Sequence, residues 1–303
     1  METRAMERKK LLFIYNPHAG KAHIRNYLLS IIDTFTKAGY EVTAYPTQKH
    51  GDAVEMVIGR AAEFDLLVCS GGDGTLDEVV TGMMQCCVEI PLGYIPAGST
   101  NDFAGSLKLP KDMVKAARIA VGDQLFACDV GSFNNDTFVY IAAFGLFTDV
   151  SYETNQQVKN VLGYMAYILE GVKRLSAIKS YPMKVIADGR EYSDNFMYGM
   201  VTNSRSVGGF KNITGKNVEL DDGLFEVTLI KRPKNAIELN NIMAALIGAK
   251  IDNNSMHCFK ASHIEIETET EIPWTLDGEF GGNHKSILIR NEKRAINFKI
   301  SEK

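Results

Sequence analysis

This chain of 303 residues lacks three features: a large excess of charge of one sign, a long apolar run and a regular cysteine pattern. The formal net charge of −4 provides no basic excess for broad nucleic-acid binding. The five cysteines are scattered without metal-ligand spacing, which is typical of reduced thiols in a cytoplasmic protein. No run approaches the ~18 apolar residues that cross a bilayer, and the polar, basic start does not resemble a secretory signal. We therefore expect a cytoplasmic protein that at most lies peripherally on the inner face of the membrane.

Several common catalytic motifs are also missing. The chain has no G-x-x-x-x-G-K-[ST] loop, so a P-loop enzyme is not expected, and no G-x-G-x-x-G follows any strand. Its six histidines form no H-E-x-x-H pair, and there is no G-x-S-x-G turn that would expose a nucleophilic serine. Hydrolase chemistry therefore has little support in the sequence.

The most informative feature that is present is the turn Gly71-Gly72-Asp73-Gly74-Thr75. It follows the apolar run 66–70, a predicted buried strand, and precedes apolar residues at helical spacing. Its glycines let backbone N–H groups approach a ligand, and the amino end of the next helix favours phosphate. Asp73 suits such a site only if a divalent cation joins the phosphates. The turn predicts a nucleotide–magnesium site, with a tight turn that binds nothing as the weaker alternative.

The first ~125 residues repeat a unit of strand, loop and helix, which indicates a parallel sheet covered by helices. Strands are expected at 11–15, 41–45, 66–70 and 92–95. Polar loops that contain glycine follow the first, third and fourth of these strands. Because such loops converge at the carboxyl edge of an open sheet, we expect all three to meet at one ligand.

Beyond residue ~127 the pattern changes to short alternating runs separated by turn residues. Strands are expected at 137–141, 183–187, 196–201 and 264–272, with Asp188-Gly189 as a hairpin turn. Four glutamates alternate with isoleucine and threonine in the last run, so we expect them to form a solvent-exposed strand face rather than a metal site. Helices are expected at about 158–177 and 235–249. This part is predicted to be a mainly antiparallel β domain.

An ordered set of motifs carries a family resemblance. It comprises Asn16-Pro17…Gly20-Lys21, the glycine turn, Pro96-x-Gly98-x-x-Asn101-Asp102, residues 150–154, Leu220-Asp221-Asp222-Gly223 and Asp277-Gly278-Glu279. The chain resembles the diacylglycerol kinase catalytic-domain family, in particular its soluble bacterial lipid kinases, over nearly its whole length. The resemblance implies an α/β nucleotide-binding domain of the NAD kinase and diacylglycerol kinase type at 1–127. The final strand, about 290–303, is expected to return to this domain, and a β-sandwich lipid-substrate domain is expected at 128–289.

The resemblance also assigns roles to residues. ATP would contact a set from the loops after the strands: Asn16, Pro17, His18, Ala19, Gly20, Thr47, Gly72, Asp73, Gly74, Thr75, Leu76, Asp77, Glu78 and Ser99. Lys21, Asp73 and Asp102 would shape the magnesium and phosphate network, as neutralisation of the phosphates requires. Glu219, Asp222 and Leu224 match a family metal site, the first and last through backbone carbonyls, and Glu279 matches the general base. Ser99 and Asp77 depart from the usual Thr and Asn but keep hydrogen-bonding capacity.

Plainer interpretations of these residues stay open. Asp277-Gly278 is also a strong hairpin turn, after which Glu279 merely starts a strand. Asp221-Asp222-Gly223 is equally good turn chemistry. Lys21 fits a solvated position at a helix start, although its charge there opposes the helix dipole. The helix at 158–177 is more typical of a core helix than of a membrane contact, although Lys173 and Arg174 keep interfacial docking open.

The expected function is that of an ATP- and Mg²⁺-dependent lipid kinase that phosphorylates diacylglycerol to phosphatidic acid in phospholipid metabolism. Another lipid alcohol or NAD is the alternative acceptor. An alternative of another class is a catalytically silent nucleotide-binding regulator, against which the presence of Asp73, Asp102 and Glu279 together argues. The expected partners are a lipid substrate and a peripheral membrane surface but no nucleic acid, while a homodimer stays open.

Overall fold

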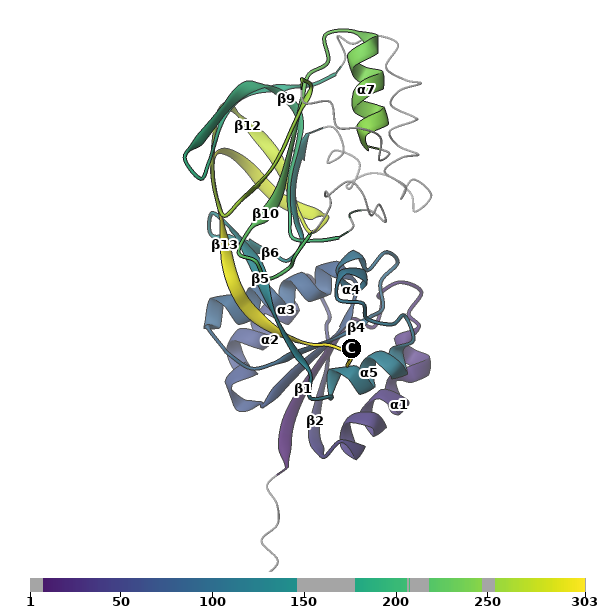
Figure 1. Ribbon diagram of the computed structural model, residues 1–303. Helices are drawn as coiled ribbons and strands as arrows, with labels where there is room; N and C mark the ends of the chain where they lie inside the picture. Colours follow the sequence, from purple (N-terminus) through teal and green to yellow (C-terminus); the bar gives the residue numbers. More distant parts are fainter. Residues whose placement is uncertain (1–7, 146–177, 206, 208–217, 247–253, 303) are drawn as a thin grey trace, which may run out of the picture. The chain divides into compact units, whose positions relative to one another are not determined.

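The structure, a computed structural model, describes residues 8–145, 178–205, 207, 218–246 and 254–302 (Figure 1). The chain divides into two compact units. We call Met1–Cys128 with Arg294–Lys303 the α/β unit, and Asp129–Lys293 the β unit. In the part that is described, no helix has the length and apolar character needed to cross a membrane.

The α/β unit is built on a parallel sheet. Strands β1 (Lys9–Tyr15), β2 (Tyr40–Pro46), β3 (Leu66–Gly71) and β4 (Leu92–Pro96) lie in the order β4-β3-β1-β2. The end of β13 (Glu279–Lys299) adds a further parallel strand beside β4, where Phe298 pairs with Leu92. The C-terminal strand therefore does return to this unit.

Helices connect these strands: α1 (Ile24–Lys37), α2 (Asp52–Arg60) with the short 3₁₀ turn η1 (Ala61–Glu63), α3 (Asp73–Cys86), α4 (Asp102–Ser106) and α5 (Met113–Ala120). Apolar residues of α1 and α5, among them Ile31, Phe35 and Ala116, bury the same core face as Leu11 and Phe13 of β1. Burial of this apolar stripe at helical spacing holds the helices on the sheet and so fixes where the loops emerge.

The β unit is a mainly antiparallel sandwich, as the alternating pattern predicts. Its strands are β5 (Leu125–Phe133), which begins in the α/β unit, β6 (Asp136–Phe138), β7 (Ile141–Gly145), β8 (Tyr181–Ala187), β9 (Arg190–Thr202), β10 (Phe225–Lys231), β11 (Met256–Ala261), β12 (His263–Leu276) and the first part of β13. Helix α7 (Ala236–Leu246) follows β10. The core centres on Trp274, which packs against Phe133 and Phe144 with ring centroids 5.1 Å and 4.9 Å away.

Two predictions for this unit are refined by the structure. The run 137–141 is not one strand, because the chain bends at Val139 and Tyr140 between β6 and β7. The four glutamates of β12 are all exposed, which confirms the solvated strand face: Glu265, Glu267, Glu269 and Glu271. The predicted helix at 158–177, the motif at 150–154, Lys173 and Arg174 lie outside the described residues.

Candidate functional site

The three glycine loops of the α/β unit pack backbone against backbone. Gly20 has a φ of +59°, and a Cβ built on it would lie 2.4 Å from the carbonyl oxygen of Ala97. A Cβ on Gly98 would lie 2.6 Å from the Cα of Gly72. Since real Cβ atoms do not approach other atoms this closely, only glycine allows these loops to meet. The convergence expected from the strand ends is therefore present.

Hydrogen bonds hold the loops in this arrangement. The N–H of Asn16 donates to the Ser70 carbonyl at 2.9 Å, and the N–H of Ala97 donates to the Gly71 carbonyl at 2.7 Å. Asn101, with φ of 53°, closes the third loop: its Oδ1 accepts from the Gly98 N–H at 2.9 Å and its Nδ2 donates to the Gly98 carbonyl at 2.7 Å. The loops therefore form a preorganised surface of backbone groups, which suits phosphate oxygens.

Asp73 and Asp102 are brought together at this surface. Each is the first residue of a helix, α3 and α4 respectively, and the Asp102 N–H donates to Asp73 Oδ2 at 3.2 Å. Tyr94 lies buried below them and donates to the Gly71 carbonyl at 3.2 Å. Burial, supported by the charge of Asp73, raises the pKa of the Tyr94 phenol well above its usual value. The Asp73 carboxylate beside these glycine loops, with a second aspartate next to it in space, fits a Mg²⁺ ion that accompanies phosphates, because Mg²⁺ prefers oxygen ligands.

The other predicted nucleotide residues fall into two groups. Thr75 and Leu76 are buried in the first turn of α3, Thr47 is buried with its N–H donating to the Tyr15 carbonyl at 2.9 Å, and Ala19 is buried. The rest are partly or fully exposed around the loops: Asn16, Pro17, His18, Gly20, Lys21, Gly72, Gly74, Asp77 and Ser99. The exposed group is accessible to a ligand, whereas the buried side chains shape the loops.

Glu78 has a role in the structure that the sequence did not suggest. Its carboxylate accepts the N–H groups of Gly51 at 2.9 Å and Ala53 at 3.1 Å, at the amino end of α2, and lies 3.0 Å from the His50 ring. Asp52 in turn accepts the Gln48 N–H at 2.7 Å. Glu78 therefore fixes the loop that carries Thr47, whether or not it also contacts a nucleotide.

The predicted metal segment of the β unit is already engaged by cationic side chains. Asp222 Oδ2 lies 2.8 Å from Lys260 Nζ, its Oδ1 accepts the Leu224 N–H at 3.0 Å, and its carbonyl accepts from Lys293 at 3.2 Å. Asp129, fully buried, accepts the Gly223 N–H at 2.6 Å and so holds the same turn. A divalent cation on Asp222 Oδ2 would have to displace the ammonium group of Lys260, so this arrangement does not fit a metal as it stands.

Lys260 also faces a second carboxylate. Its Nζ lies 3.1 Å from Oε1 of Glu226, which is 6% exposed. Burial raises the pKa of Glu226 to about 7, although Lys260 acts in the opposite direction. Among the residues that the structure describes, no group of three or more His, Cys, Asp and Glu side chains could hold a metal ion. Glu219 is exposed and Leu224 is half-buried. Because these two residues are predicted to bind the metal through their backbone carbonyls, the exposure of their side chains does not test the predicted metal site.

Glu279 is exposed at the start of β13, directly after the hairpin turn at Asp277 and Gly278. Both turn residues have positive φ, 51° and 90°, as a type I′ turn requires. The turn interpretation and the exposed carboxylate are therefore both present, and the first does not exclude a catalytic role for Glu279.

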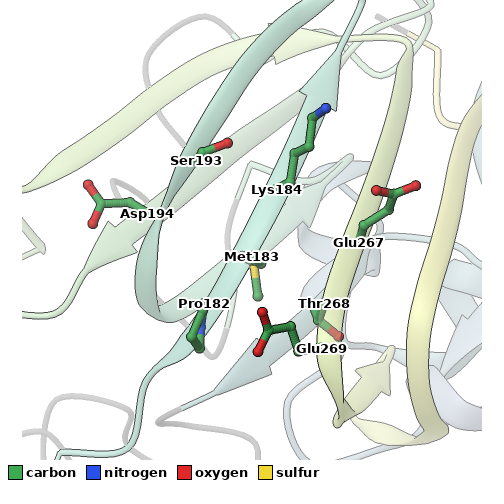
Figure 2. A pocket seen from close by; sticks show the side chains of 8 residues that line it. All are labelled: Pro182, Met183, Lys184, Ser193, Asp194, Glu267, Thr268 and Glu269. Carbon is green, nitrogen blue, oxygen red and sulfur yellow. The ribbon is translucent and has the colours of Figure 1, made fainter.

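A separate cavity of about 540 Å³ lies on the β unit, beside β8 (Figure 2). Its walls come from β8, β9 and β12 and include Lys184, Asp194, Glu267 and Glu269. This charged lining does not suit an acyl chain, and none of the predicted site residues lines it. The cavity therefore gives no support to the expected lipid site.

Sequence reasoning missed Asn101, Tyr94, Asp129 and Lys260 as residues that shape these sites. Asn101 belongs to the motif Pro96-x-Gly98-x-x-Asn101-Asp102, so the sequence did indicate its loop but not its hydrogen bonds within that loop. The side chains of Asp129 and Lys260 act on residues 94 and 38 positions away in the chain, and no local pattern indicates such partners.

Comparisons with known proteins support the resemblance over both units. Residues 10–133 match the model of the diacylglycerol kinase catalytic domain, and residues 141–289 match the YegS C-terminal NAD kinase beta sandwich-like domain. The chain is 33% identical to a diacylglycerol kinase of Bacillus subtilis over 276 residues, which are 90% of this chain and 91% of the relative. It is 36% identical to one from Staphylococcus epidermidis over 293 residues, 94% of this chain and 90% of the relative. A solved diacylglycerol kinase structure from Bacillus anthracis matches with a TM-score of 0.76 at 25% identity, covering 97% of this chain and 98% of that one.

Proposed function

Because the chain belongs to the diacylglycerol kinase catalytic-domain family, we propose that it is an ATP-dependent lipid kinase that phosphorylates diacylglycerol to phosphatidic acid. One observation of the structure carries the proposal furthest. Three glycine loops meet backbone against backbone, and the Asp73 carboxylate at this place accepts the backbone N–H of Asp102. This arrangement suits a nucleoside triphosphate with its cation better than it suits a simple anion.

In this proposal the loops bind ATP and hold its phosphates. Backbone N–H groups of Gly20 and of residues 72–74, at the amino end of α3, approach the phosphate oxygens, and the exposed Lys21 and Ser99 add a charge and a hydroxyl. Asp73 and Asp102 would hold Mg²⁺, which when bound offsets negative charge on the transferring phosphoryl group. Thr47 is kept in place by Tyr15 and by the contacts of Glu78 around α2.

Glu279 acts as the general base in this proposal. Its carboxylate takes the proton of the lipid hydroxyl while the hydroxyl oxygen forms a bond to the γ-phosphorus of ATP. The bond between that phosphorus and the bridging oxygen breaks, and the electron pair leaves with ADP. A carboxylate on the exposed end of a hairpin is accessible to a substrate, which this role requires.

The acceptor resides in a membrane, so we propose that the protein works at an anionic membrane surface. Lys179, exposed beside Tyr181 with its Nζ 5.2 Å from the ring centroid, is a described basic residue that could contribute to attraction. Rates on diacylglycerol in anionic vesicles should exceed rates on a soluble short-chain diacylglycerol. Equal rates would contradict interfacial docking.

The proposal is tested by incubating the protein with labelled ATP and a panel of acceptors: diacylglycerol, other lipid alcohols and NAD. We expect transfer to diacylglycerol, and transfer only to another acceptor would overturn the substrate assignment. Asp73→Ala should abolish transfer, because it removes a carboxylate proposed to hold Mg²⁺, and the melting temperature of the variant shows whether the fold is retained. ATP binding without transfer to any acceptor would instead indicate a silent nucleotide-binding regulator.

Glu279→Gln tests the base. This change keeps shape and removes the proton acceptor, so turnover should fall ~10²- to 10⁴-fold with ATP affinity nearly unchanged. Glu271→Gln, which alters an exposed glutamate of β12, is the matched control and should keep wild-type turnover. If Glu279→Gln also keeps it, the base lies elsewhere and Asp222 is the next residue to test.

A further inference from the structure

Asp277 makes contacts that exceed what a hairpin turn needs. Its side chain is 4% exposed, and its carboxylate accepts three backbone N–H groups, those of Val139 at 2.5 Å, Tyr140 at 2.9 Å and Ile141 at 2.9 Å. Its own N–H donates to the Ile141 carbonyl at 2.8 Å. One residue of the β12–β13 turn therefore fastens the whole bend between β6 and β7.

This contact explains why the run 137–141 bends instead of forming one strand. The N–H groups of Val139 and Tyr140, which a straight strand would offer to a neighbouring strand, point at the Asp277 carboxylate. Beyond the bend, β7 pairs with β12 through Ala142↔Leu276 and Ala143↔Thr275. Two kinds of contact therefore hold the end of the β12–β13 hairpin against β7: the pairing of β12 with β7 and the hydrogen bonds of the Asp277 carboxylate.

Glu279 lies two residues beyond this fastening point. A hairpin end with an exposed glycine such as Gly278, which has no atoms within 4 Å of a built Cβ, has little packing of its own to hold it. Catalysis nevertheless needs the base held within a few tenths of an ångström, since a displacement of 1 Å can cost ~10²-fold in rate. Pairing of Glu279 with Leu276 holds the two strands of the hairpin together, and the Asp277 carboxylate fixes the hairpin against the 139–141 bend.

We infer that Asp277 is the positioning residue for Glu279: its carboxylate clamps the 139–141 bend and thereby fixes the hairpin from which Glu279 projects. The inference rests on the proposed role of Glu279 as the base. It goes beyond that proposal because it separates two functions of Asp277, that of a turn residue and that of a hydrogen-bond acceptor for the 139–141 bend. The turn alone, with positive φ at both central residues, accepts Asn at least as well as Asp, whereas the clamp needs a carboxylate.

Asp277→Asn therefore keeps the turn and breaks the clamp. An amide has one acceptor oxygen, and its NH₂ group would face N–H donors. The chain also offers a matched control in the β8–β9 turn, where Asp188 and Gly189 have φ of 45° and 82°. The Asp188 carboxylate accepts from the Ser262 N–H and hydroxyl, both at 3.0 Å, and from the His263 N–H at 2.9 Å. This aspartate makes the same kind of contact at an exposed position, on a hairpin that carries no proposed catalytic residue.

The experiment compares kcat, KM for ATP and melting temperature for Asp277→Asn and Asp188→Asn. We expect Asp277→Asn to lower kcat about 10- to 100-fold with KM for ATP unchanged. Asp188→Asn should keep kcat within about twofold even if it melts lower. Equal kcat for the two variants would overturn the inference.

A double variant separates this inference from the proposed function. If Asp277 acts through Glu279, Asp277→Asn has little further effect on kcat when Glu279→Gln is already present. If the fold losses in kcat of the two single variants multiply in the double variant, the inference is overturned. If Glu279→Gln alone keeps wild-type turnover, the proposed base is overturned instead. Should Asp277→Asn fail to fold, Val139→Pro removes one of the three donors just outside β6 and should lower kcat by a smaller factor. An unchanged kcat in that folded variant would contradict the clamp.

Discussion

In the α/β unit the glycine loops meet through close backbone approaches, whereas in the β unit carboxylates hold the chain in place. Gly20 and Gly98 each occupy a position where a Cβ would lie within 2.6 Å of a backbone atom of another loop. In the β unit, by contrast, Asp129, Asp188 and Asp277 each accept N–H groups from distant turns. The loop contacts of the α/β unit require positions without a side chain, whereas the contacts in the β unit require a carboxylate.

The difference follows from the two architectures. In a parallel α/β sheet the loops at the carboxyl edge are neighbours by construction, so short loops with glycine suffice to bring backbone groups to a ligand. In an antiparallel sandwich the turns lie at strand ends and expose N–H groups with no ladder partner. One carboxylate can accept several of these N–H groups, as the buried Asp277 does, and thereby fixes one turn relative to another.

The largest effect is expected from a substitution that breaks the backbone contacts between the loops of the α/β unit. Gly98→Ala would place a Cβ 2.6 Å from Gly72 Cα and 2.8 Å from Asn101 Oδ1, so two of the three loops must separate. We expect ATP affinity and kcat/KM to fall ~100-fold or more, while the helices and the core are retained. Nucleotide titration and turnover on diacylglycerol measure the loss.

Gly105→Ala is the matched control for this change. A Cβ there meets nothing within 4 Å, and the residue lies in α4 of the same unit. Its activity should equal that of the wild type. If Gly98→Ala behaves like Gly105→Ala, the loop contacts do not organise the nucleotide site.

How far the sequence could predict these sites depends on how local each one is. The turn at 71–75, the strand before it and the helix after it all lie within about twenty residues, so the strand–turn–helix unit was predicted correctly. The bend at Val139 and Tyr140 was not, because its cause, the Asp277 carboxylate, is 138 and 137 residues away. Likewise, Asp221-Asp222-Gly223 indicated a turn, but nothing nearby indicated that Lys260 would bind Asp222.

A smaller effect is expected when the cation between Asp222 and Glu226 is removed. Lys260→Met keeps the apolar stem and leaves the two carboxylates facing one another without their counterion. Removing one partner of a buried ion pair costs about 3–5 kcal/mol, and the partial exposure of Lys260 should reduce this to about 1–3 kcal/mol. Calorimetric unfolding of the whole chain measures the change.

Lys184→Met provides the control, because Lys184 pairs with Glu191 at 3.2 Å while both side chains are exposed. It should change stability by less than about 1 kcal/mol. Equal losses in the two variants would show that the Lys260 pair is no more than a surface contact. Repeating the measurement with Mg²⁺ also tests the predicted metal site: full recovery of Lys260→Met by Mg²⁺ would show that a divalent cation can replace the ammonium at Asp222.

The smallest expected effect concerns pH and the β unit alone. His257 lies on β11 with its ring centroid 5.1 Å from that of Tyr192 and 6.2 Å from that of Phe196. Burial lowers the pKa of His257 below 6.5, the charge of Lys231 lowers it further, and Asp194 opposes both. The folded state therefore binds fewer protons than the unfolded state just below pH 6.5. The stability that His257 contributes is thus full above pH 6.5 and is lost as the pH falls towards its folded pKa.

His257→Phe keeps a ring between these aromatic side chains and removes the proton site. Relative to the wild type, this variant should gain stability as the pH falls from 7 to 5, and the difference should be constant above pH 7. Because the histidine is only partly buried, we expect a gain below about 1 kcal/mol, or at most a few degrees in Tm. Melting curves of both proteins across this range measure it, and parallel curves from pH 7 to 5 would show that the imidazole of His257 takes up its proton equally well in the folded and unfolded chains.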